Sequence, residues 1–235
     1  MTNRPTRGRW TRLLPLVVVL GLFAFLAGRS FVGKASVHST HPLTGRRIAG
    51  IATDPRWMDR SSREKEEQPD RALDLIGVVP GMIVADVGAG SGYMTTRLGQ
   101  RVGPSGKVYA NDVQPALLEI LRDKAQRDGL TNIEVVLGTE EDARLPDHAI
   151  DLVLLVDVYH EFSQPQKMLQ SIRRSLKPGG ELVLMEYRKE DPSIPISDEH
   201  RLGVTEALTE VQAEGFTFDR LIPGLPRQHI IVFRD

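Results

Sequence analysis

The sequence predicts an α/β domain over residues 69–235, built on an open, doubly wound and mostly parallel sheet. Short apolar runs typical of buried strands alternate there with segments whose apolar residues recur at helical spacing. The run at 151–156 is apolar after its first residue, as strands covered on both faces are. Turns rich in glycine separate the elements, and the most distinctive one is GAGSG at 88–92.

The first half of the domain contains three predicted strands. A short helix at 69–76 precedes the strand at 83–87, and the glycine turn leads from this strand into a helix with one apolar face. The turn GPSG separates that helix from a strand at 107–111. The next helix begins at Pro115, a residue suited to the first helical position, and Gly129 ends it before a strand at 133–137.

The second half of the domain contains four predicted strands. The strand at 151–156 is followed by a helix that Ser163 caps, with Met168, Leu169 and Ile172 on its buried face. The turn LKPGG then leads into a strand at 181–187. A further helix, capped by Asp198, precedes two terminal strands at 216–221 and 229–233.

The composition excludes several classes of function. The chain has 235 residues, of which 40% are hydrophobic and 26% are charged, and its formal net charge is -1. This charge gives no electrostatic case for a nucleic-acid partner. The absence of cysteine excludes disulfides, thiolate metal sites and a cysteine nucleophile.

Residues 1–32 are predicted to be a signal peptide or a signal anchor. Four arginines precede an apolar run at 13–27, which is short for a span of ~20 residues but fits a secretory signal. We expect attachment to a membrane through this segment, or export, and prefer an uncleaved anchor. The side of the membrane stays open, because Arg46 and Arg47 weaken the excess of basic residues before the run.

Residues 33–68 are interpreted as a linker and a lead-in helix. His38 and His41 have no recognised metal-ligand spacing, so no metal site is predicted. The charged stretch at 56–67 predicts an exposed helix. Trp57 and Met58 either fold over a ligand or pack onto the domain, and packing is the preferred interpretation.

The glycine turn predicts a ligand site between a strand and a helix N-terminus, where the main chain can be approached closely. The dinucleotide spacing G-x-G-x-x-G would require glycine at Tyr93, which argues against a pyrophosphate and an NAD-dependent oxidoreductase. Asp86 suits a positively charged ligand. Asp112, 20 residues after Gly92, stands where a carboxylate accepts hydrogen bonds from ribose. The predicted ligand therefore has a ribose and a positive centre.

The motifs VADVGAGSGY, VYANDVQP and LKPGGELVLME resemble those of the class I S-adenosylmethionine-dependent methyltransferases. The resemblance implies a Rossmann-like, seven-stranded sheet whose last strand is antiparallel. It implies S-adenosylmethionine as cofactor, held by Asp86, Gly88, Ala89, Gly90, Ser91, Gly92, Asp112 and Asp157. It also implies an adenine contact in the acidic loop GTEEDARLP, where Asp142 and Ala143 match best and Glu140 or Glu141 are alternatives.

The segment DVYHEF at 157–162 is the best candidate for catalysis, because ligands of open α/β sheets bind beyond the carboxyl ends of the strands. His160 is predicted to be a general base for an oxygen or carbon acid, and Tyr159 to orient the substrate. The alternative for His160 is a supporting hydrogen bond to Glu161 or to a loop carbonyl.

The resemblance predicts methyl transfer to an unidentified small molecule by in-line displacement. Two alternatives stay open, namely a non-catalytic S-adenosylmethionine-binding module and a protein-isoaspartate O-methyltransferase. The second is suggested by GSGY and EEQPDRAL. Neither the methyl acceptor nor the oligomeric state follows from the sequence.

Overall fold

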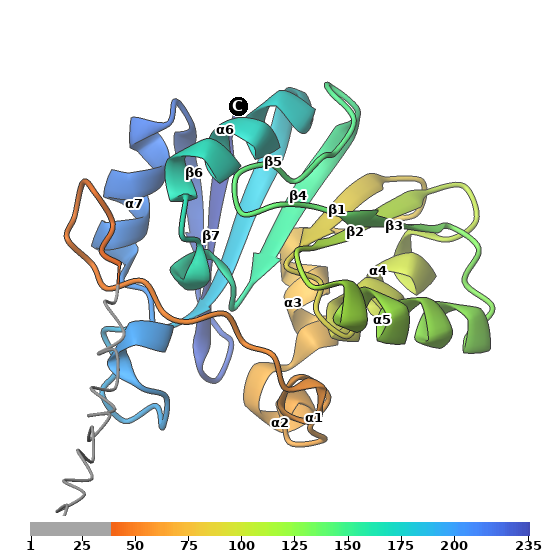
Figure 1. The fold of residues 1–235 in the computed structure, drawn as a ribbon, viewed down its shortest axis with the longest axis horizontal. Helices are drawn as coiled ribbons and strands as arrows, with labels where there is room; N and C mark the ends of the chain where they lie inside the picture. The colour runs from red at the N-terminus through yellow and green to blue at the C-terminus, as the bar shows by residue number, and fades with distance from the viewer. Residues whose placement is uncertain (1–38) are drawn as a thin grey trace, which may run out of the picture. The chain divides into compact units, whose positions relative to one another are not determined.

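The fold is taken from a computed structural model that describes residues 39–235 (Figure 1). The predicted signal peptide or anchor at 1–32 lies outside the described residues. In the part of the chain that is described, no helix has the length and apolar character needed to cross a membrane.

A seven-stranded sheet with the strand order β3-β2-β1-β4-β5-β7-β6 forms the centre of the fold (Figure 1). Neighbouring strands from β3 to β5 are parallel, and β7 runs antiparallel to both β5 and β6. This confirms the predicted fold, including the antiparallel last strand. The strands are β1 Ile83–Val87, β2 Lys107–Asp112, β3 Ile133–Leu137, β4 Ile150–Val156, β5 Leu176–Tyr187, β6 Thr217–Ile222 and β7 Gln228–Arg234.

Helices cover both faces of the sheet (Figure 1). The α3 and α4 helices pack on one face, and α6 and α7 pack on the other. The α5 helix packs Leu118 and Leu121 near β2. The helices are α1 Pro55–Met58, α2 Arg63–Glu67, α3 Pro69–Ile76, α4 Tyr93–Val102, α5 Pro115–Arg127, α6 Pro165–Ser175 and α7 Val204–Ala213, with short 3₁₀ turns η1 Tyr159–Glu161 and η2 Asp198–His200.

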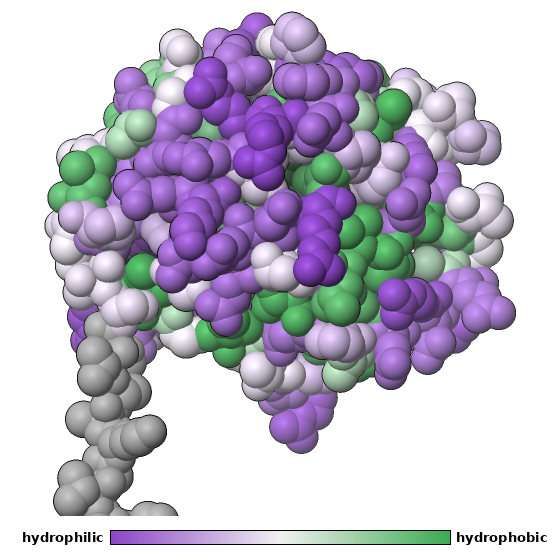
Figure 2. All heavy atoms as spheres, turned by 45° about the horizontal axis from the view of Figure 1, so that its top comes forward, coloured by the Kyte–Doolittle hydropathy of each residue, from purple (hydrophilic) through white to green (hydrophobic). Residues whose placement is uncertain are grey.

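The β4 strand shows why the central strands are continuously apolar. Leu152 and Leu154 pack with α3 and α4, whereas Val153 and Leu155 pack with α6 and α7. Successive side chains of a strand point to opposite faces, and here both faces are buried. Charged and polar residues, in contrast, cover most of the molecular face in Figure 2.

Three elements differ from their predicted form. The β5 strand begins at Leu176, so LKPGG belongs to the strand, and α7 begins after Gly203 instead of at Asp198. The single exposed helix predicted at 56–67 is two short helices, and Arg63 and Glu67 are buried. These two residues form an i,i+4 ion pair with 2.7 Å between Arg63 Nη2 and a Glu67 oxygen, which a solvated helix would also show. Their burial comes from tertiary contacts.

Residues 39–54, within the segment predicted as linker and lead-in, are anchored to the domain by a buried ion pair. Arg46 donates from Nε and Nη2 to the two oxygens of Glu210 on α7, at 3.1 and 2.9 Å. Both side chains are almost fully buried. The main-chain N–H of Ala49 and a guanidinium N–H of Arg46 donate to the carbonyl oxygen of His160. The segment therefore reaches the end of β4.

Candidate active site

A cavity of about 620 Å³ lies beyond the carboxyl ends of β1, β2 and β4. The glycine turn, the η1 segment, the lead-in segment and the loop after β5 all contribute to its walls. Of the residues predicted from the sequence, those lining it are Asp86, Gly88, Ala89, Gly90, Ser91, Asp112, Asp157 and His160. The fold thus joins the two ends of the predicted site into one space.

The turn after β1 requires glycine at more than one position. Gly88, Gly90 and Gly92 have φ values of +77°, +54° and +88°, which residues other than glycine rarely adopt. A Cβ on Gly88 would lie 2.3 Å from Cγ2 of Val158, so the turn also packs directly against the segment that follows β4. The absence of a side chain at Gly88 therefore allows these two parts of the cavity wall to pack against each other.

Asp112 at the end of β2 is fixed by main-chain donors. The N–H groups of Gly90 and Gln114 donate to its two carboxylate oxygens, both at 2.8 Å. A carboxylate can accept about four hydrogen bonds, so these two donors do not use its full capacity. Burial raises the pKa of Asp112 above its ordinary value, although these N–H donors oppose the shift. The position and free acceptors fit a contact with ribose hydroxyls.

Asp86 and Asp157 are buried acids at the ends of β1 and β4. The hydroxyl of Thr95 donates to Asp86 at 2.6 Å, and burial raises the pKa of Asp86 to about 6. Asp157 has a φ of +50° and accepts a hydrogen bond of 2.8 Å from the side-chain amide of Gln228. Its second oxygen is buried without a partner, and burial followed by the charge of Glu67 raises its pKa. Both acids favour a positively charged ligand group nearby.

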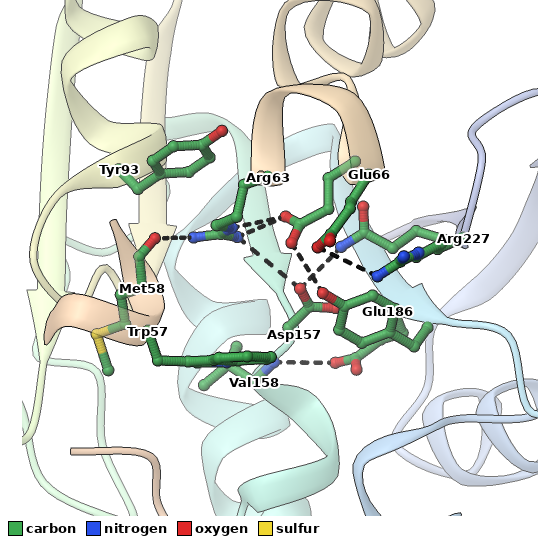
Figure 3. A network of polar contacts seen from close by, with 12 residues as sticks. Trp57, Met58, Arg63, Glu66, Tyr93, Asp157, Val158, Glu186 and Arg227 are labelled. Carbon is green, nitrogen blue, oxygen red and sulfur yellow. Dashed lines mark hydrogen bonds and ion pairs between the residues drawn. The ribbon is translucent and has the colours of Figure 1, made fainter. Parts of the chain in front are cut away.

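Arg63 connects α2 to this wall (Figure 3). Its guanidinium carbon lies 4.0 Å from the centre of the Tyr93 ring, and its Nη2 lies 3.9 Å from Asp157. Glu67 pairs with Arg63 and accepts a hydrogen bond from the hydroxyl of Tyr187 at 2.8 Å. This network holds α1 and α2 at the rim, where Trp57 and Met58 line the cavity.

His160 lies in η1 and is held by Glu186 of β5. Its Nδ1 is 2.6 Å from Oε2 of Glu186, and the other carboxylate oxygen, Oε1, accepts hydrogen bonds from the main-chain N–H groups of Val158 and Tyr159. A carboxylate accepts, so Nδ1 carries a proton, and Nε2 presents its lone pair when the ring is neutral. Burial lowers the pKa of His160, but Glu186 and the other nearby acids raise it to a net value above the ordinary one.

Nε2 of His160 lies 3.1 Å from Nδ1 of His200 in η2. Glu161 is close to the same atom, with 3.8 Å between its Oε1 and Nε2 of His160. Burial raises the pKa of Glu161 to about 7 and lowers that of His200. All three side chains line the cavity.

Four residues predicted from the sequence do not line the cavity. The ring of Tyr159 is fully buried in the core, and the guanidinium carbon of Arg46 lies 5.5 Å from the ring centre. The 3₁₀ turn directs Tyr159 into the core, whereas His160 lines the cavity. Gly92 is the N-cap residue of α4 and packs against the side chain of Leu121. Asp142 accepts from Ser171 and from the N–H of Arg144, and Ala143 is buried. Glu140, one of the alternatives in that loop, does line the cavity.

Sequence reasoning missed most of the wall opposite the glycine turn. Residues 50–54 and 195–197, together with Gln114 and His200, line the cavity. The segment 50–54 carries no motif, and His200 is 40 residues from His160. Long-range folding brings them together, so no local signal was available.

A sequence model described as a methyltransferase domain matches residues 85–184, which is less than half of the chain. Together with the fold and the site, this match supports a class I S-adenosylmethionine-dependent methyltransferase. S-adenosylmethionine is the cofactor that these similarities and the geometry of the glycine turn and Asp112 indicate.

Among curated proteins, the chain is similar to the ubiquinone/menaquinone biosynthesis C-methyltransferases of Hydrogenovibrio crunogenus and Vibrio campbellii. The first is 32% identical over 119 residues and the second 29% identical over 160 residues. The matches cover 50% and 67% of this chain, and 47% and 62% of those proteins. The chain thus spans roughly half to three fifths of the length of these relatives.

Among solved structures, an S-adenosylmethionine-dependent methyltransferase from Aquifex aeolicus is similar over 78% of this chain and 99% of its own. The TM-score is 0.73 and the identity is 29%. The [4+2]-cyclase SpnF has a TM-score of 0.61 at 18% identity, a likeness that shows the fold alone.

Proposed function

We propose that this protein transfers the methyl group of S-adenosylmethionine to a small molecule that is bound beside His160. The observation that carries the proposal is that the glycine turn, Asp112 and His160 line one cavity. The names of the curated relatives support transfer to carbon, and an acceptor with an acidic oxygen beside that carbon fits a site centred on histidine. The cofactor supplies an electrophilic methyl group on a positively charged sulfur.

The residues present fit this cofactor. Asp112 has free acceptor positions for ribose hydroxyls, and the glycine turn leaves no side chain between the cavity and the main chain. Asp86 and Asp157 supply negative charge where the cofactor is positive. Arg63, between Tyr93 and Asp157, suits a carboxylate group (Figure 3).

His160 is the residue that we assign to activation of the acceptor. In the transfer, the acceptor atom bonds to the methyl carbon as the carbon–sulfur bond breaks, and the electron pair stays on sulfur. Nε2 of His160 takes the proton of the acceptor and later releases it to solvent. Glu186 fixes the ring of His160 so that Nε2 faces the cavity, which supports direct participation at the acceptor.

Binding of the cofactor product is the first test. S-adenosylhomocysteine is titrated by calorimetry into the full chain, where a micromolar dissociation constant corresponds to about -8 kcal/mol. Asp112→Ala removes charge-assisted acceptors of ~1.5–3 kcal/mol each, so we expect affinity to fall at least tenfold. Asp123→Ala is the matched control, since Asp123 is exposed on α5 and does not line the cavity, and it should bind as the wild type does. A folded wild type that binds NADH instead would refute the proposal.

A second test separates an enzyme from a non-catalytic binding module. His160→Ala should keep affinity for S-adenosylhomocysteine within a few fold, because the glycine turn and Asp112 are untouched. Methyl transfer to phenolic and quinol acceptors should fall by 10²–10⁴-fold, the usual contribution of a positioned acid–base group. Equal turnover in the variant and the wild type would remove His160 from the reaction.

We also propose that residues 1–32 tether the protein to a membrane or direct its export. The proposal rests on the arginines that precede the apolar run at 13–27. Alkaline carbonate extraction of cell membranes tests it. Retention of the full chain in the pellet, and release of a chain that lacks residues 1–32, are the expected results.

A further inference from the structure

The side chains of His160, Glu161 and His200 converge on one point at the wall of the cavity, and we refer to them as the His–Glu–His cluster. Among the residues that the structure describes, this cluster meets the geometric condition for a metal ion, with one ligand atom of each residue within 4.8 Å of the others. His160 and Glu161 come from η1 and are buried. His200 comes from η2, and its ring is perpendicular to that of His160 at 86°.

Two of the three distances between ligand atoms are close to those around a small divalent ion. Ligands with bonds of ~2.0–2.1 Å at tetrahedral angles are about 3.3 Å apart. Nε2 of His160 lies 3.1 Å from Nδ1 of His200 and 3.8 Å from Oε1 of Glu161. Shifts of a few tenths of an ångström would bring these pairs to that spacing.

With both imidazoles neutral and Glu161 ionised, the cluster has more acceptor atoms than protons. The N–H on Nδ1 of His160 is used by Glu186, which leaves Nε2 as an acceptor. A proton on Nδ1 of His200 satisfies Nε2, and among the described residues the hydrogen bonds to the Glu161 carboxylate come from the N–H of Ala52, at 3.2 Å. A proton or a metal ion between these atoms would relieve their repulsion, and a metal ion can be bound by all three side chains at once.

The surroundings resemble the outer shell of a metal centre. A histidine that binds a metal usually donates its other N–H to a carboxylate, as His160 does to Glu186 at 2.6 Å. Glu161 is oriented by the N–H of Ala52. Asp157, Glu161 and Glu186 add negative charge around His160, and the nearest arginine contact, from Arg46, is to its carbonyl oxygen.

We propose that the His–Glu–His cluster binds a divalent transition-metal ion, with zinc the best match to two imidazoles and one carboxylate. Three protein ligands leave a coordination position open, and the cluster lines the cavity, so that position is available to an oxygen of the methyl acceptor. This inference rests on the proposed function. If the acceptor binds at the open coordination position, it is a molecule with a hydroxyl or carbonyl oxygen. With the ion bound to Nε2, His160 would act as a metal ligand, and the ion, in place of a free imidazole, would polarise that oxygen.

The test uses the full chain without a histidine tag, stripped by chelator and titrated with Co²⁺ and Zn²⁺. We expect one equivalent of Co²⁺ to give the intense visible bands of a tetrahedral site, and Zn²⁺ to displace it. Glu161→Gln and His200→Ala should each weaken metal binding at least 100-fold. Glu186 orients His160 without being a ligand, so Glu186→Gln should weaken metal binding by 10–100-fold. His148→Asn is the control, because His148 is exposed and its φ of +52° suits asparagine. It should bind metal as the wild type does.

Circular dichroism and titration with S-adenosylhomocysteine on the same samples separate the possible failures. Binding of the product without stoichiometric metal would overturn the metal site and leave the proposed function intact. Metal binding that is equal in the wild type, Glu161→Gln and His200→Ala would also overturn it. If the folded wild type does not bind S-adenosylhomocysteine, the proposed function is wrong. The cobalt bands of the wild type and their loss in the variants would still establish the metal site.

Discussion

Glu210→Gln tests whether the buried ion pair with Arg46 holds the lead-in segment onto the domain. The two side chains are 0% and 2% exposed, and they share two hydrogen bonds. The substitution keeps the shape but leaves the guanidinium buried without a counter-charge. Removing one partner of a buried pair costs about 3–5 kcal/mol. We expect a loss of this size in the free energy of unfolding.

Urea denaturation followed by circular dichroism measures the change, provided that the dependence on urea concentration keeps its slope. The matched control is Glu199→Gln, which breaks the pair between Glu199 and Arg47. Those side chains are 29% and 56% exposed, so the expected loss is at most about 1 kcal/mol. Replacing both Arg46 and Glu210 by methionine should recover much of the lost stability. If Glu210→Gln costs no more than Glu199→Gln, the lead-in segment is not anchored by this pair.

Two further predictions concern the cavity wall. Gly88→Ala places a Cβ 2.3 Å from Val158 Cγ2 at a φ of +77°, so thermal unfolding should show a loss of more than about 2 kcal/mol, which Val158→Ala partly restores. The pKa of Asp86, about 6 in the fold, exceeds its unfolded value of about 3.9. The native state therefore binds more protons between these pH values, and stability should fall by up to about 3 kcal/mol as pH rises from 4 to 6.5. Asp86→Asn should remove that fall; an unchanged profile of stability against pH would contradict the assignment.

Regular elements were predictable because their signals are local. The apolar runs of β1 and β4 and the glycines at 88–92 specify a strand, a turn and a helix without help from distant residues. The charge pattern of residues 56–67 predicted an exposed helix instead of two short ones, because burial of Arg63 and Glu67 depends on Tyr187 and Asp157. Those partners come from elements about 90–120 residues away.

The candidate site divides in the same way. Asp112 and His160 were identified because each stands at the end of a strand, and parallel strands bring their carboxyl ends to one edge of the sheet. Tyr159 and Asp142 are near the same edge, but their side chains point into the core and toward Ser171. The direction of a side chain in a turn depends on its dihedral angles, which the order of the strands does not set.

The sequence by itself determined the α/β fold and the glycine turn, and it predicted Asp86 and Asp112 as strand-end acids of a cofactor site, since these features depend on periodicity and on residues close along the chain. Only the tertiary structure decided the acceptor side of the cavity. It placed residues 50–54 as a wall, oriented His160 through Glu186, and brought His200 to within 3.1 Å of it. The physical reason is that these contacts join segments with no fixed spacing in sequence, and they form only when the sheet and its helices pack.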